Sequence, residues 1–482
     1  MDLSHVAQSI CAFFIGLFIW IISTRQYNVP SGFATKSVYN NCALQSFSDD
    51  CVEHLKSQCQ LVHINALFRH GTRSSSGKDI RKFVDLYNRL IESETAKLPP
   101  GFIGHPIPFE HHAHKVLLPK GFRELYELGQ KFRQRASSAF DFHDSNIRFV
   151  SSSYERALDS GRSFYHGFFN LPPLHNSSEQ ERSCPPTTDS QSTCITPIPG
   201  ERILVDDSLL RFFDYCERYR RDIEKNRSSI QEYLEYRHGP EMLHVLHDVV
   251  KKFNLDKKRF TVDDMYTLYV ACAFETANDP ESKPHSPWCG FFETNHFPQF
   301  WLKSYGYELN YLQSCPLVGS ILAHPTSIEH HRATFWFGHA ETLLPVVAAF
   351  GLFNDSVGHD RLVKLRANGF LKWLAKLHSD PVPPTMFRSG HIAPFAGNLA
   401  LFLYYCPNAT TESDSNDPFA GFYVQPEVNE RTVAWPLGAE FDPPTTAKPG
   451  AACAPLSRVL KRLNNCMPDV YDESKVCQAN GA

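Results

Sequence analysis

The order of apolar and polar positions predicts strands that alternate with helices along much of the chain. Short apolar runs typical of buried strands occur at residues 61–68, 147–151, 334–337 and 398–405. Helical spacing of apolar residues follows the first three runs, at residues 80–91, 154–169 and 341–350. This alternation predicts an α/β fold with a mostly parallel central sheet flanked by helices. Ligands of such sheets bind beyond the carboxyl ends of the strands.

One long stretch lacks strand patterns and predicts a helical insertion between the strands of the sheet. Helical spacing extends over residues 209–237 and again over residues 243–253. Thr261 and Asp264 have the spacing of a capping box, which predicts the start of a third helix. We expect this block to cover the site at the strand ends.

These patterns divide the chain into four parts. They are an N-terminal leader, a first part of the α/β core, a helical cap, and a second part of the core with a Cys-containing C-terminal segment, at residues 1–30, 31–170, 171–290 and 291–482. The cap begins with an irregular loop rich in Pro, Ser and Thr, which we expect a disulfide between Cys184 and Cys194 to hold.

The N-terminal segment and the cysteines predict entry into the secretory pathway. Residues 10–22 are apolar over the length of a signal-peptide core, which favours a cleaved signal and leaves an uncleaved anchor as the alternative. All 14 cysteines except Cys11 lie outside this segment, as in a disulfide-bonded protein. The chain ends without a retrieval tetrapeptide, so we expect a secreted or membrane-attached extracellular protein rather than one of the ER lumen. Glycosylation sequons stand at Asn176, Asn226, Asn354 and Asn408.

The net charge of −4 excludes a global basic field. Neither nucleic acid nor an anionic membrane surface is therefore expected as a partner of the folded part, and any polyanion site must be local. Positive charge is concentrated in one stretch with a single carboxylate, at Arg69, Arg73, Lys78, Arg81 and Lys82. The last three are equally well explained as a solvated helix face.

The first predicted strand ends in a histidine between two arginines. The residues are Arg69-His70-Gly71-Thr72-Arg73. An imidazole between two guanidinium groups is held neutral by like charge and can act as a nucleophile. The guanidinium groups can bind the oxygens of a tetrahedral oxyanion.

The ends of the next two strands add the other parts of a phosphoryl-transfer site. Arg156 lies early in the helix after residues 147–151, where its side chain can join backbone N–H groups at an anion. His339 follows the third strand and can donate to a phosphate oxygen, and Glu341 is the candidate acid for the leaving oxygen. A general acid must start protonated, so we expect mildly acidic pH to favour activity.

Together these motifs resemble the histidine acid phosphatase superfamily, and His339-Ala340-Glu341 resembles its branch of multiple inositol polyphosphate phosphatases. Further similar stretches lie at residues 210–216, 287–289, 337–345 and 387–392, and the likeness extends from about Cys42 to the Cys466 region. The resemblance implies that His70 becomes a phosphohistidine and that Glu341 protonates the departing inositol oxygen. It also implies a set of residues that hold the phosphate, namely Arg69, Arg73, Arg156 and His339.

The resemblance implies a phosphomonoesterase of inositol polyphosphates such as phytate, with 2,3-bisphosphoglycerate as a further substrate. It implies no metal or other cofactor, because the arginines supply the positive charge. Weaker candidates are Lys78, Arg81 and Lys82, which could contact the non-reacting phosphates, and Arg388 and His391, which could support the site from behind. The oligomeric state is left open.

Three other functions fit parts of the sequence. A broad acid phosphatase of small monoesters would share the first motif, but His-Asp is usual there in place of His-Ala-Glu. A catalytically silent polyanion-binding surface protein would not need His70, Arg73 and Glu341, which are all present. A phosphohistidine mutase would form an isomer and no free phosphate.

Overall fold

The computed structural model of the chain describes residues 33–39, 50–137, 139–140, 146–174, 203–229, 234, 237–278, 286–292, 312–323, 331–353, 387, 389–407, 417–435 and 451–478. Within these ranges, no helix has the length and apolar character needed to cross a membrane. The apolar segment at residues 10–22 and the loop of Cys184 and Cys194 lie outside the described residues.

An eight-stranded mixed sheet forms the centre of the molecule, in the order β3-β2-β4-β1-β5-β6-β7 with β8 beside β6. Its strands are β1 (Gln60–Arg69), β2 (Ile147–Ser151), β3 (Ile203–Val205), β4 (Ala333–Gly338), β5 (Asn398–Tyr405), β6 (Phe422–Val428), β7 (Arg431–Thr432) and β8 (Ala454–Pro455). The first four are parallel, whereas β5 and the strands beyond it are antiparallel. The four predicted strands and the α/β architecture are confirmed.

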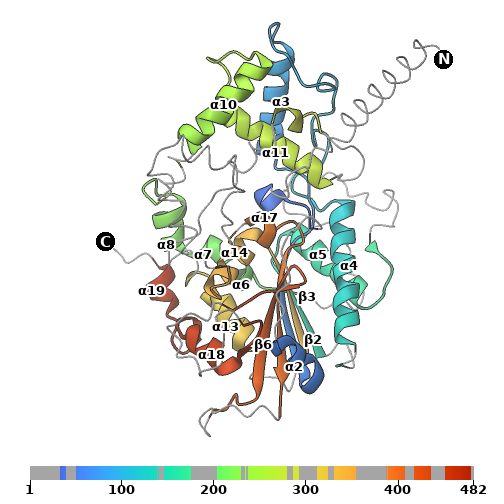
Figure 1. The fold of residues 1–482 in the computed structure, drawn as a ribbon, viewed down its shortest axis with the longest axis vertical. Helices are drawn as coiled ribbons and strands as arrows, with labels where there is room; N and C mark the ends of the chain where they lie inside the picture. The colour runs from blue at the N-terminus through green and yellow to red at the C-terminus, as the bar shows by residue number, and fades with distance from the viewer. Residues whose placement is uncertain are drawn as a thin grey trace, which may run out of the picture.

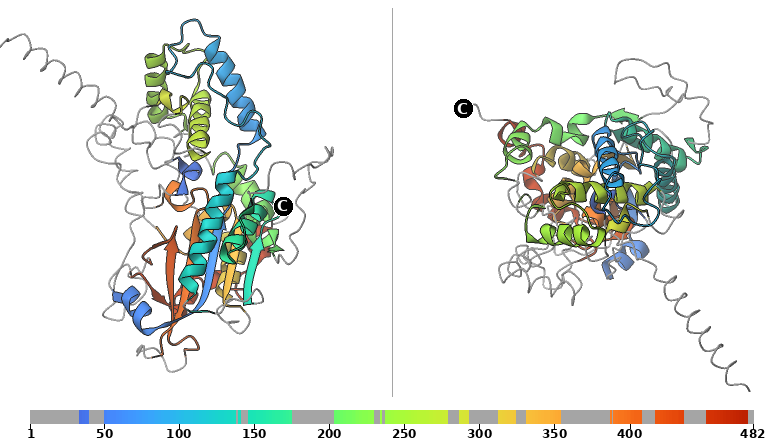
Figure 2. Two further views of the ribbon diagram at one scale, coloured as in Figure 1. Left: turned by 90° about the vertical axis from the view of Figure 1, so that its right-hand side faces the viewer. Right: turned by 90° about the horizontal axis from the view of Figure 1, so that it is seen from above.

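Helices cover both faces of the sheet (Figures 1 and 2). The helices α4 (Pro119–Ala136) and α5 (Glu155–Phe168) lie on one face, where Phe68 of β1 packs against Phe132 and Phe164. The other face carries α13 (Cys315–Ala323), α14 (Ala340–Ala349) and α18 (Leu456–Arg462). There Leu67, the neighbour of Phe68 in β1, joins their apolar side chains, because successive strand residues face opposite sides.

A helical lobe stands beyond one end of the sheet, formed by α3 (Gly77–Ile91), α10 (Pro240–Phe253) and α11 (Val262–Asn278) (Figures 1 and 2). The helices share a core that includes Phe83, Val249 and Leu268. The capping box predicted at the start of α11 is present, since the Thr261 backbone N–H donates to Asp264 at 2.8 Å. The lobe thus combines the inserted helices with α3, which directly follows the first strand.

Short turns occupy residues 207–224, in the segment where the spacing predicts one helix over residues 209–237. They are α6 (Asp207–Leu210), α7 (Phe212–Tyr215), α8 (Glu217–Tyr219) and a π-helical turn at Arg220–Glu224. The helix is interrupted at Cys216, whose ψ of 93° is extended and whose sulfur is bound to Cys477. Tertiary attachment here overrides the local spacing.

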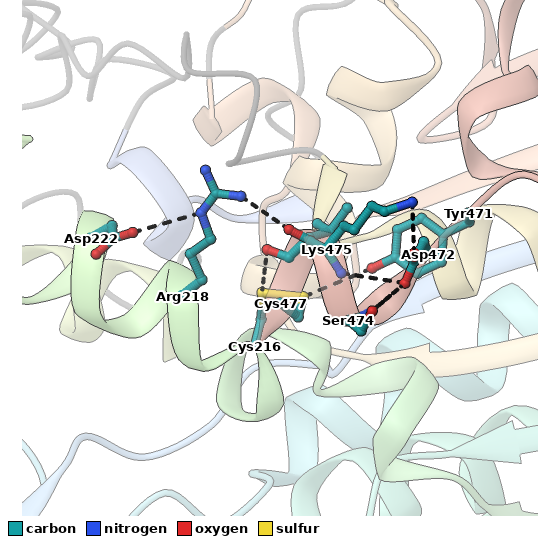
Figure 3. The surroundings of a disulfide bond; sticks show 9 residues. Cys216, Arg218, Asp222, Tyr471, Asp472, Ser474, Lys475 and Cys477 are labelled. Carbon is teal, nitrogen blue, oxygen red and sulfur yellow. Dashed lines mark hydrogen bonds and ion pairs between the residues drawn. A yellow bond between two sulfur atoms is a disulfide. The ribbon is translucent and has the colours of Figure 1, made fainter. Parts of the chain in front are cut away.

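Five disulfides lie within the described residues, as the cysteine content predicts, and all but one join segments more than 150 positions apart. They are Cys51–Cys453, Cys59–Cys406, Cys216–Cys477, Cys272–Cys289 and Cys315–Cys466. Figure 3 shows the third, which attaches α19 (Glu473–Cys477) to the turns beside α8. The remaining elements are η1 (Ala34–Lys36), α2 (Asp50–Gln58), a turn at Cys289–Phe291, α17 (Ser389–Ile392) and a turn at Asn464–Cys466.

Candidate active site

Three parallel strands end side by side and bring the predicted site residues together. Arg69 at the end of β1 pairs with Gly338 at the end of β4, and Ser151 of β2 pairs with Phe337. The His70 backbone N–H donates to the carbonyl oxygen of Gly338 at 3.0 Å. The imidazole rings of His70 and His339, 269 positions apart in the chain, therefore lie 5.6 Å apart between centroids.

His70 is held as a neutral imidazole with a defined tautomer. Its side chain is buried, at 3% exposure, and its Nδ1 lies 2.9 Å from the carbonyl oxygen of Gly71. A carbonyl can only accept, so Nδ1 carries the proton and Nε2 keeps its lone pair. Burial and the nearby charges of Arg69 and Arg156 hold the pKa of His70 well below its usual range. This is the state that a nucleophilic imidazole requires.

Arg69 is fixed at the floor of the site. Its Nη1 donates to the carbonyl oxygens of Thr35 and Ala393, the latter at 2.9 Å, and its guanidinium lies over the Phe395 ring at 4.4 Å. Burial lowers the pKa of Arg69 to about 9, which still leaves the group charged at neutral pH. These contacts orient the Arg69 guanidinium group without neutralising its charge.

Arg73 and Arg156 complete a cluster of three cations around His70. Arg73 donates to the carbonyl oxygen of Ser74 at 2.7 Å, and burial with repulsion from Arg156 lowers the pKa of Arg73 to about 10. In the described part of the chain, no carboxylate forms an ion pair with Arg69, Arg73 or Arg156, and the buried Nε of each has no hydrogen-bond partner. Buried donors are seldom left unpaired, so the cluster is built for an anion.

His339 links the third strand end to Arg156. The Arg156 Nη2 lies 3.3 Å from His339 Nδ1, and His339 Nε2 lies 2.9 Å from the Ser152 hydroxyl. A guanidinium can only donate, so Nδ1 is the acceptor and the ring proton is on Nε2. Burial and the Arg156 charge hold the pKa of His339 well below its usual range. His339 therefore orients Arg156 in this structure.

Glu341 lies in the first turn of α14, and its side chain is exposed at the mouth of the site. Its charge acts on all three arginines of the cluster and is the largest opposing influence on the pKa values of Arg69 and Arg156. The carboxylate thus faces the same space as the guanidinium groups while remaining open to solvent. That position suits an acid that meets the leaving oxygen of a substrate.

The loop of His70 is held from behind by α4. The Glu124 carboxylate accepts from the Thr72 backbone N–H and from its hydroxyl, both at 2.8 Å. A Cβ added at Gly121 of α4 would lie 2.2 Å from the Thr72 carbonyl oxygen, so only glycine permits this close approach. The geometry of the nucleophile loop therefore depends on a helix 50 residues further along the chain.

The weaker candidates lie on α3, on α17 or outside the described residues, and their roles stay predictions. Lys78, Arg81 and Lys82 are exposed on α3. The pKa of Asp263 on α11 is lowered mainly by its hydrogen bond with Arg237, with a smaller contribution from the charge of Lys82. His391 is buried on α17, and its carbonyl oxygen accepts from Asn429 at 2.6 Å. Arg388 lies outside the described residues, as do three of the glycosylation sequons, at Asn176, Asn354 and Asn408. The fourth sequon, at Asn226, lies in a described turn.

Three residues beside the site carry no sequence signal that assigns them a role. The guanidinium groups of Arg156 and Arg211 both lie over the Tyr154 ring, which is 40% exposed, at 4.4 and 4.1 Å from its centroid. Lys36 of η1 has Nζ 5.6 Å from the Phe274 ring. Arg211 lies in the similar stretch at residues 210–216 and Tyr154 begins the helix predicted at residues 154–169, but Lys36 precedes every predicted strand and motif.

One group of side chains in the described residues has the spacing of a metal site, at His54, Cys59 and Cys406. Cys59 and Cys406 form a disulfide, so their sulfurs are not thiolate ligands. The group also stands apart from the strand ends, because Cys59 precedes β1 and Cys406 follows the antiparallel β5. It does not extend the chemistry of the site.

Comparisons with known proteins identify the family of the chain. A family model described as the histidine phosphatase superfamily (branch 2) matches residues 60–429. Multiple inositol polyphosphate phosphatase 1 of Homo sapiens is 28% identical over 415 residues, which are 79% of this chain and 76% of that protein. The Gallus gallus protein of the same name is 26% identical over 440 residues, 86% of this chain and 87% of that protein.

Solved structures share the fold at low identity. The multiple inositol polyphosphate phosphatase of Bifidobacterium longum, crystallised with inositol hexasulfate, has a TM-score of 0.61 and 15% identity, over 93% of this chain and all of that one. The phytase from D. castellii has a TM-score of 0.57 and 16% identity, over 91% and 86% of the two chains. The family model covers most of the chain, including all three strand-end motifs, and the chain therefore belongs to branch 2 of the histidine phosphatase superfamily and is a phosphatase.

Proposed function

We propose that this phosphatase removes phosphate groups from inositol polyphosphates such as phytate, through a phosphohistidine at His70. The observation that carries the proposal is the cluster of Arg69, Arg73 and Arg156, which has no ion-pair partner in the described residues and surrounds a neutral imidazole. A substrate with several phosphates supplies the negative charge that such a cluster lacks.

The reaction follows from the positions of two side chains. The Nε2 lone pair of His70 attacks phosphorus, the bond to the inositol oxygen breaks, and that oxygen takes the proton of Glu341. In the second step the Glu341 carboxylate takes a proton from water, whose oxygen attacks phosphorus. The bond from phosphorus to Nε2 then breaks, its electron pair returns to the imidazole, and inorganic phosphate leaves.

The cations stabilise the transferred group during both steps. Arg69, Arg73 and Arg156 meet the equatorial oxygens, where charge develops in the transition state. His339 can join them if its Nε2–H exchanges the Ser152 hydroxyl for a phosphate oxygen. The arginines supply the charge that other phosphatases take from a metal ion, so we expect full activity in excess chelator.

The proposed substrate is supported by the names of the relatives, two of which are multiple inositol polyphosphate phosphatases, and by a related structure that binds inositol hexasulfate. The five disulfides of the described residues support a site of action in the secretory pathway or outside the cell.

The test is phosphate release from phytate by the purified protein at pH 5 and pH 7, with chelator present. His70→Ala should abolish release without changing the circular dichroism spectrum, and His54→Ala on α2 is the matched control. Release from nitrophenyl phosphate alone would indicate a broad acid phosphatase. Absence of phosphate release from both substrates, or strict Mg²⁺ dependence, would contradict the proposal.

A further inference from the structure

The N-terminal turn η1 crosses the active site, although it precedes the first strand by more than 20 residues. The Thr35 carbonyl oxygen accepts from Arg69, and the Ser37 carbonyl oxygen accepts from the Phe395 backbone N–H at 3.1 Å. A Cβ added at Gly390 of α17 would lie 2.8 Å from the Ala34 carbonyl oxygen. The turn is therefore closely packed against the floor of the site.

This packing places the Lys36 side chain beside the cationic cluster. Its Nζ lies 5.6 Å from the centroid of the Phe274 ring, and the Arg73 guanidinium lies 5.5 Å from the same ring. The described part of the chain gives this ammonium neither a hydrogen bond nor an ion pair. A half-buried, unpaired lysine next to arginines is unfavourable unless an anion joins them.

The charges around Lys36 define which side of the site it occupies. It interacts with Arg69 and Arg73 at the end of β1, with Asp79 on α3 and with Glu341 on α14. Burial, followed by repulsion from Arg73 and Arg69, lowers the pKa of Lys36 to about 8, whereas Asp79 and Glu341 oppose this shift.

The groups that act on the nucleophile overlap only in part with those that act on Lys36, since Arg69 and Arg73 act on both. The charges that shift the pKa of His70 most are those of Arg69, Arg156 and Arg73, followed by His339, and Lys36 is not among them. Lys36 lies on the Arg73 side of the site, because both cations lie over the ring of Phe274 of the helical lobe. In the proposed reaction Arg73 contacts the transferred phosphate, so an anion at Lys36 would be a neighbour of that phosphate.

We propose that Lys36 is a specificity-determining residue that binds a phosphate group other than the transferred one, and thereby selects ligands with two or more phosphates. The proposal rests on the proposed function for its catalytic test, but its binding test does not. The face of the Phe274 ring holds the Lys36 ammonium and the Arg73 guanidinium on the same side of the site through cation–π contacts, so the second phosphate would meet Lys36 next to the phosphate that Arg73 holds.

The catalytic test compares substrates with and without a second phosphate. Lys36→Met should lower kcat/KM for phytate about tenfold, which corresponds to about 1.4 kcal/mol, and should leave nitrophenyl phosphate within about twofold. Lys36→Arg should restore phytate turnover because it keeps the charge. Lys56→Met on α2, an exposed lysine paired with Glu53, is the matched control and should change neither substrate.

The pH dependence separates a charge role from a packing role. Lys36 is a cation below its pKa of about 8 and loses its proton above it, whereas an arginine keeps its charge. The ratio of phytate kcat/KM between wild type and Lys36→Arg should therefore fall between pH 7 and pH 9. The substrate phosphates and the other site groups titrate in both proteins and cancel in this ratio.

Binding supplies a readout that does not depend on turnover. Calorimetric titration with inositol hexasulfate should show a Kd about tenfold weaker for Lys36→Met, with unchanged affinity for inorganic phosphate and an unchanged Tm. Equal losses for both ligands, or for both substrates, would place Lys36 on the transferred phosphate and overturn the proposal. Unchanged values for all of them would overturn it as well. Intact selective binding without turnover would refute the proposed function alone.

Discussion

The contact between Glu124 and Thr72 provides a sharp test of how the nucleophile loop is held. Thr72 is fully buried, and its N–H and hydroxyl both donate to the Glu124 carboxylate. Glu124→Leu leaves both donors unpaired, at a cost of roughly 1–3 kcal/mol each. Burial raises the pKa of Glu124, so removing a costly buried charge offsets part of this loss. We expect a net loss of about 2–3 kcal/mol.

Glu124→Gln separates hydrogen bonding from charge at the same position. The amide oxygen can still accept from the Thr72 N–H, and the amide nitrogen can donate to the Thr72 hydroxyl, so the loop keeps both contacts. We expect Glu124→Leu to lose roughly 30- to 100-fold in kcat/KM, because a displaced loop misplaces His70. Glu124→Gln should lose less than about tenfold.

The assay is kcat/KM on phytate and on nitrophenyl phosphate, together with the free energy of unfolding from urea titration. The value of kcat/KM should fall equally for both substrates, because the loop carries the nucleophile that attacks both of them. Glu127→Leu, an exposed position on the same helix, is the matched control. Normal turnover by Glu124→Leu, or equal losses for Leu and Gln, would refute the role of the hydrogen bonds.

Three further predictions concern the chemistry and the scaffold. Glu341→Gln should slow phytate hydrolysis by roughly 10²–10⁴-fold but nitrophenyl phosphate much less, because nitrophenolate leaves without a proton; equal losses in turnover assays would remove the acid role. Arg156→Lys should lower kcat/KM by about 10- to 100-fold, since an ammonium cannot hold both His339 and a phosphate oxygen; wild-type kinetics would argue against that double contact. Replacing Cys216 and Cys477 by serine should destabilise the protein by roughly 2–5 kcal/mol in urea titration, and an unchanged unfolding curve would show that α19 is held without the disulfide.

Local patterns were sufficient to predict the central elements. The run at residues 147–151 became β2 at those bounds, and the spacing after Gly77 became α3, which starts where Ser76 caps it. Both patterns depend on neighbouring residues, because strand alternation and helical periodicity record which side of an element is buried. The antiparallel direction of β5 was not predictable in this way, since an apolar run is compatible with either direction.

The breaks in residues 209–237 show where local patterns fail. Cys216 leaves helical geometry, and its disulfide partner Cys477 lies 261 positions away. Helical spacing describes what a segment favours by itself, and a distant covalent contact can outweigh a preference of a few tenths of a kcal/mol per residue.

The sequence by itself determined the chemistry of this protein. His70, Arg69 and Arg73 are neighbours in the chain, so one short motif contains both the nucleophile and the cations that act with it. Only the tertiary structure decided which remote groups join them. Glu124 and Lys36 reach the site through the docking of α4 and η1. Electrostatic and hydrogen-bond contacts between distant segments leave no periodicity in the sequence, since they depend on distances that the packed fold alone sets.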